Sequence, residues 1–207
     1  MNTIKEIVEK LTNGAKTDED KMERIFYFVR DEIPFNFINS YYVSAEYVLK
    51  KRRGVCMNKA VLLVAIAKEA VIPARFHYSW VTPECLIDLI HSIHYKNLPN
   101  PFLHIFAEVK LKNKWVPMDA IFDNKLFEAL VKKKLNFARY PEKRNLSNQF
   151  SSSGVTGGPM LFEVKDGGHG DDLTKLKEND PTTLFQRFLM PFIFYINNKI
   201  IKKVRCT

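Results

Sequence analysis

Residues 53–71 read RGVCMNKAVLLVAIAKEAV, and this stretch decides the fold. Residues 60–67 are apolar on every side of a helix, which is typical of a helix buried in the middle of a protein. Gly54 interrupts the chain just before it, so Cys56 lies where this helix begins. Unpaired backbone N–H groups and the positive end of the helix dipole favour a thiolate at that position. A small buried cysteine without a chemical role is the alternative interpretation.

Helices are predicted before this stretch and strands after it. Apolar residues at helical spacing and capping residues predict helices at 4–11, 17–33 and 45–51. Alternation of apolar and polar residues predicts strands at 74–80, 104–111 and 115–119, with a helical insertion at 83–94. This order predicts an α+β fold, in which N-terminal helices and the central buried helix pack on an antiparallel sheet.

His104 and Asp119 flank the predicted hairpin almost symmetrically about its turn at Lys112-Asn113. In an antiparallel pair they would lie directly opposite, or within one or two pairs of it. Opposite side chains lie close enough for an Asp–His hydrogen bond. Because a thiol nucleophile needs a base, and the base needs an orienting group, Cys56, His104 and Asp119 form the candidate catalytic set.

Three segments carry a resemblance to a known family. They are residues 54–60 (GVCMNKA), residues 72–76 (IPARF), and the pair 104–109 (HIFAEV) and 115–119 (WVPMD). Together they resemble the transglutaminase-like superfamily of papain-fold cysteine enzymes over about residues 17–122. The resemblance implies that Cys56 forms a thioester with an acyl donor, that His104 is base and then acid, and that Asp119 orients it. It also implies thiol-dependent acyl transfer or amide hydrolysis, with no cofactor and no metal.

The motif departs from the family in several places. Val55 and Met57 stand where animal transglutaminases have Gln and Trp, and Lys50 stands where papain has its oxyanion glutamine. Asn58, Tyr41 and Tyr42 are the candidate side-chain oxyanion donors. The calcium sites of animal transglutaminases cannot be traced.

Several reactions fit the same residues. Hydrolysis, deamidation, transamidation and acetyl transfer are all open, and Arg53-Gly54 is similar to an element of arylamine acetyltransferases. The chain lacks the paired zinc cysteines of peptide glycanases in this superfamily. The partner is expected to be a protein or peptide amide, with an amine as a second substrate. The alternative function is an inactive transglutaminase-like binding module for a protein partner.

Composition limits the expected partners and the expected location of the protein. The chain has 207 residues, three cysteines and a net charge of +9. Its basic residues are scattered, so no specific nucleic-acid binding is expected. The cysteine count does not suggest a disulfide framework, and no signal peptide is visible, so a cytoplasmic location is expected.

The domain boundary is predicted near residue 135, with a catalytic core at 1–135 and a loop-rich extension at 136–207. Glycines at 167, 168 and 170 predict a flexible turn there. The extension ends in an amphipathic helix at about 182–203, whose stripe (Phe185, Phe188, Leu189, Phe192 and Tyr195) is expected to dock on its own domain, with membrane contact as the less favoured alternative. Cys85, His91 and His94 are a weak metal candidate.

Overall fold

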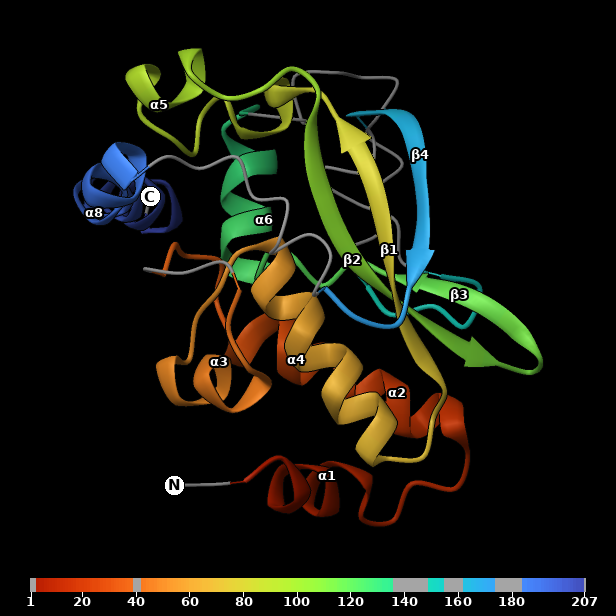
Figure 1. The fold of residues 1–207 in the computed structure, drawn as a ribbon. Helices are drawn as coiled ribbons and strands as arrows, with labels where there is room; N and C mark the ends of the chain where they lie inside the picture. The colour runs from red at the N-terminus through yellow and green to blue at the C-terminus, as the bar shows by residue number, and fades with distance from the viewer. Residues whose placement is uncertain (1–2, 39–41, 136–148, 155–161, 174–183, 207) are drawn as a thin grey trace.

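A central helix, α4 (Cys56–Glu69), organises the protein. The structure is a computed structural model that describes residues 3–38, 42–135, 149–154, 162–173 and 184–206, except for the side chains of 184–189. Leu62, Ile66 and Ala67 of α4 are fully buried, as its uniformly apolar sequence predicts. Figure 1 shows α4 between the other N-terminal helices and the sheet. The helix therefore holds its first residue, Cys56, at a fixed place in the core.

The N-terminal helices begin and end where the sequence predicts. They are α1 (Ile4–Thr12), α2 (Asp18–Tyr27), the π-helical turn η1 (Phe28–Glu32) and α3 (Ala45–Lys51). Thr3 and Thr17 form capping boxes at the starts of α1 and α2, and Ser44 caps α3. These helices pack against α4, and their apolar faces enclose it.

One antiparallel sheet covers the other side of α4. Its strands are β1 (Ala74–Val81), β2 (Phe102–Leu111), β3 (Lys114–Met118) and β4 (Glu163–Gly170), in the order β3-β2-β1-β4. Both turn residues of the β2–β3 hairpin, Lys112 and Asn113, have positive φ, as a tight two-residue hairpin requires. The predicted α+β fold, with its central helix on an antiparallel sheet, is confirmed.

Two predicted segments differ from the structure. The insertion at 83–94 is two short helices, η2 (Pro83–Leu86) and α5 (Ser92–Lys96), because Leu89 and Ile90 turn into the core while Ile93 is exposed. The predicted flexible turn at 167–170 is part of β4, which pairs with β1. A Cβ on Gly167 would lie 2.9 Å from the backbone oxygen of Tyr78, so glycine permits this close pairing rather than a loop.

The C-terminal helix docks on α6 (Asn124–Lys132). Helix α6 itself was not predicted from the sequence. Helix α8 (Leu184–Arg205) buries Phe194, Asn197 and Ile201. It therefore docks on its own domain, but Phe192 and Tyr195 of the predicted stripe face outward, at 65% and 57% exposure. The side chains of the other three stripe residues, Phe185, Phe188 and Leu189, lie outside the described set. Within the described ranges, no helix has both the length and the apolar character needed to cross a membrane.

Candidate active site

Cys56 is the first residue of α4, and the chain before it is clamped. Gly54 and Phe35 form a parallel bridge, in which the Asn36 N–H donates to the Gly54 carbonyl at 3.2 Å. The Val55 N–H donates to Oδ1 of Asn58 at 3.1 Å, which closes the turn into the helix. A Cβ on Gly54 would lie 2.7 Å from the Cβ of Asn58, so only glycine fits there. The half-buried Cys56 thiol is thus presented from a rigid helix start.

His104 and Asp119 form a buried pair near the open end of the β2–β3 hairpin. Nε2 of His104 lies 2.9 Å from Oδ2 of Asp119, and the two side chains are 1% and 2% exposed. The register pairs Ala107 with Met118, so Asp119 comes just after β3 and lies diagonal to His104. This lies within the two-pair range expected from sequence. The ring of Phe106 stacks on the imidazole at 5.8 Å between centroids.

The charge of Asp119 controls the protonation of His104. Burial alone would lower the pKa of the imidazole, but the negative charge of Asp119 and its hydrogen bond outweigh this effect. Interaction with the Cys56 sulfur adds to them, and together they raise the pKa of His104 to about 10. The His104 imidazole is therefore expected to be protonated at neutral pH.

The second ring nitrogen of His104, Nδ1, takes no part in the bond to Asp119. Asp119 occupies Nε2, and Nδ1 is buried without a well-formed hydrogen bond in the described part of the chain. The Cys56 sulfur interacts with the ring but is not placed for an ideal hydrogen bond. Catalytic hydrogen bonds are often long in free enzymes and shorten when substrate binds. A cavity of about 10 Å³ touches both Cys56 and Asp119.

The other two cysteines differ from Cys56. Cys85 is fully buried, and burial raises the pKa of its thiol, with the nearby Cys56 adding to that rise. Cys206 is exposed at the end of α8. Cys85 therefore stays a neutral thiol, and Cys206 is an exposed surface thiol at the end of a helix rather than at its start.

The weaker sequence candidates resolve differently. Asn58 is buried and its carbonyl oxygen accepts from Val55, so it is a capping residue of α4. Tyr42 lines an open groove beside α3, and Tyr41 lies outside the described residues. The His91 ring accepts from the Ile93 N–H at the start of α5, and the His94 ring pairs with Asn197 at 2.7 Å. Among the described residues, no three potential metal ligands cluster.

Sequence comparison identifies the family. The profile of the transglutaminase-like superfamily matches residues 5–120, more than half of the chain. The chain belongs to the transglutaminase-like superfamily. Its half-buried cysteine and its buried His–Asp pair both lie within the transglutaminase-like region. Membership in this superfamily places the chain in a family of thiol-dependent enzymes.

Two solved structures show what this transglutaminase-like protein is similar to. One is a candidate cysteine protease from Cytophaga hutchinsonii, at 20% identity and TM-score 0.42, covering 56% of this chain and 36% of that one. The other is a candidate protease from Parabacteroides distasonis, at 14% identity and TM-score 0.41, covering 56% and 22%. The chain therefore spans well under half the length of either protein. No protein with a curated description matches it in sequence.

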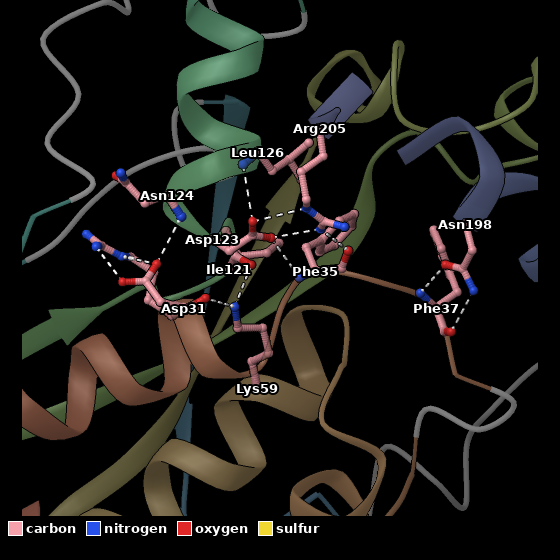
Figure 2. Close-up of polar contacts among 11 residues, drawn as sticks. Asp31, Phe35, Phe37, Lys59, Ile121, Asp123, Asn124, Leu126, Asn198 and Arg205 are labelled. Atoms are coloured by element: carbon pink, nitrogen blue, oxygen red, sulfur yellow. Dashed lines mark hydrogen bonds and ion pairs between the residues drawn. The ribbon is translucent and has the colours of Figure 1, made fainter. Parts of the chain in front are cut away.

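Beyond the transglutaminase-like match, Asp123 anchors the segment that carries Asp119. Its carboxylate accepts from the Phe35 N–H at 3.1 Å and from the Leu126 N–H at 3.2 Å. Arg205 of α8 donates to both carboxylate oxygens, at 3.1 and 2.8 Å, and to the Phe35 carbonyl (Figure 2). The C-terminal helix is thus tied to the end of the β2–β3 hairpin. Sequence reasoning missed this anchor, although an aspartate before a helical run is a capping signal.

Removing Arg205 is expected to destabilise the fold strongly. The Arg205 and Asp123 side chains are 16% and 5% exposed, so Arg205→Met leaves a buried carboxylate without its cation. Breaking such a pair costs about 3 kcal/mol or more of unfolding free energy. Urea unfolding followed by circular dichroism measures the loss. Lys202→Met, an exposed change on the same helix, is the control, and equal losses in both variants would argue against the anchor.

Proposed function

We propose that this protein is a thiol-dependent acyltransferase or amide hydrolase, with Cys56 as nucleophile, His104 as base and acid, and Asp119 as orienting group. The buried hydrogen bond of 2.9 Å between His104 and Asp119, beside the cysteine at the start of α4, carries the proposal. A surface histidine needs no buried carboxylate, and a structural cysteine needs no charged imidazole. The three side chains together match what nucleophilic catalysis requires.

The first half of the reaction forms a thioester. In the resting protein Cys56 has already passed its proton to Nδ1 of His104, and the thiolate of this ion pair attacks the carbonyl carbon of a carboxamide. The carbonyl electron pair moves to oxygen, where the backbone N–H of Cys56 at the helix start can stabilise it. The C–N bond then breaks as His104 returns the proton to the leaving amine or ammonia. Asp119 holds the imidazole in the correct tautomer and stabilises its charged form.

The second half releases the acyl group. Water or an amine attacks the thioester, His104 accepts its proton, and the C–S bond breaks to restore the thiolate. Water gives hydrolysis and an amine gives cross-linking or transfer. The substrate class is therefore a protein or peptide amide, with a primary amine as the possible acceptor, and no step uses a cofactor.

Alkylation of Cys56 is expected to stay fast at low pH. Because the pKa of His104 is raised to about 10, the imidazolium can stabilise the thiolate throughout the neutral range. An ordinary thiol has a pKa of about 8.5, so its alkylation rate would fall about tenfold per pH unit below that value. Iodoacetamide labelling from pH 5 to 9, followed by peptide mass spectrometry, measures the rate at each cysteine in one sample.

His104→Ala is the decisive comparison for this alkylation profile. It should return Cys56 to the ordinary pH dependence, while buried Cys85 stays unlabelled in the folded protein. A wild-type Cys56 that labels only above pH 8, or a profile that His104→Ala leaves unchanged, would reject the catalytic proposal. That result would favour a transglutaminase-like binding module instead.

A further inference from the structure

Lys59 is a charged residue in the most buried helix of the protein. It lies about one helical turn after Cys56, and its side chain is only 2% exposed. Lysine is almost never fully buried unless its amino group is paired. Here Nζ donates to two backbone carbonyls, that of Arg30 at 3.0 Å and that of Ile121 at 2.9 Å. Figure 2 shows Lys59 pointing from α4 into the space between η1 and the segment after β3.

The segment that Lys59 contacts has no strand or helix to hold it. Strand β3 ends at Met118 and α6 begins at Asn124, so residues 119–123 lie outside regular structure. Side chains fix this segment instead. Asp119 bonds to His104 at one end, and Asp123 bonds to Arg205 at the other. The Ile121 carbonyl, held by Lys59, is the midpoint between them.

Four charged side chains act on the amino group of Lys59. Asp123, Asp31 and Asp119 attract the ammonium, and Arg205 opposes it. Burial is the largest effect and, against these carboxylates, lowers the pKa of Lys59 to about 7. A neutral amine keeps two N–H groups, which is enough for both carbonyls. The two hydrogen bonds therefore persist in either protonation state.

We propose that Lys59 is a positioning residue, whose amino group fixes Asp119 against His104 by holding the Ile121 carbonyl to the nucleophile helix. This inference rests on the proposed function of Cys56, His104 and Asp119. Lys59 and Cys56 belong to the same rigid helix, so the bond sets the spacing between the nucleophile and the His–Asp pair. The cavity beside Cys56 supports this placement, because Lys59, Asp119 and Ile121 share its wall.

A matched pair of variants tests the proposal. Lys59→Gln and Lys59→Met have similar volume and both remove the charge, but only glutamine keeps an N–H donor for the carbonyls. The deshielded proton between His104 and Asp119, observed by proton NMR, is expected to persist in Lys59→Gln and to be lost in Lys59→Met. Alkylation of Cys56 at pH 6 is expected to be about tenfold slower in Lys59→Met than in Lys59→Gln, equivalent to about one pH unit.

Leu62→Ala creates a cavity one turn further along α4 and is the control for a general loss of stability. It should lower the melting temperature while keeping the proton signal and the pH 6 reactivity. Equal signals and rates in the two Lys59 variants would overturn the positioning role, as would the same loss in Leu62→Ala. If Lys59→Met does not fold, loss of the signal in a folded Lys59→Gln overturns it. A wild-type Cys56 without acid reactivity would reject the proposed function, whereas the NMR signal would still test the positioning.

Discussion

Replacing Cys56 with serine is expected to abolish acyl transfer. Loss of the nucleophile from a catalytic triad lowers kcat by about 10⁶-fold in the best-studied case. A serine hydroxyl is a much weaker acid than a thiol, so the ion pair that Cys56 forms with His104 would not form with serine. Without the sulfur, no thioester could form.

The assay for Cys56→Ser can use a mixed pool of glutamine-containing peptides with hydroxylamine as acceptor. Hydroxamate formation, measured by mass spectrometry, reports transfer, and ammonia release reports the first half-reaction. Cys85→Ser and Cys206→Ser are the controls and should retain the wild-type rate. If Cys56→Ser kept its activity while one of the controls lost it, the nucleophile would have been assigned to the wrong cysteine.

Asp119→Asn is expected to lower the rate by about 10⁴-fold, the loss seen when asparagine replaces a triad aspartate and favours the wrong tautomer. The charge of Asp119 is also the main reason that the pKa of His104 is raised. Without that charge, burial is opposed less strongly and the pKa of His104 falls from its wild-type value. The wild-type imidazolium should persist until the pH rises through about 10, whereas the variant should lose its proton at a clearly lower pH.

Two measurements separate these effects of Asp119→Asn. The hydroxamate assay gives the rate, and nitrogen NMR of the imidazole gives its protonation against pH. Glu108→Gln is a matched control, because Glu108 is another buried carboxylate bonded to a histidine, His77, at 3.1 Å. An Asp119→Asn protein that reacts at the wild-type rate, or whose His104 still titrates near pH 10, would contradict the assigned role.

Local sequence signals were enough to predict the N-terminal helices, α4, the β2–β3 hairpin and the candidate residues. Helix α4 is apolar all round, and such a segment has only one stable place, at the centre of the fold. The turn at Lys112-Asn113 fixed the approximate register of β2 and β3, and with it the approach of His104 to Asp119. These features depend on spacing along the chain, so the sequence contains them directly.

The features that sequence reasoning missed depend on contacts between distant segments. Strand β4 contains three glycines, which usually mark loops, and its pairing with β1 depends on the close approach to Tyr78. Similarly, Arg205 lies 82 residues after Asp123, and no local pattern connects the two. Lys59 was a further available signal, because a lysine among apolar residues on a buried helix requires a polar partner.

The clamp between Arg205 and Asp123 also has a consequence in time. While the chain is being made, the ribosome completes the cysteine, histidine and aspartate long before it reaches the arginine, which follows Asp123 by 82 residues. A nascent chain that already contains Cys56, His104 and Asp119 therefore still lacks the cation that anchors the end of the β2–β3 hairpin. Because the pair can form only after the C-terminal helix has emerged, the segment after β3 is expected to reach its full stability late in synthesis.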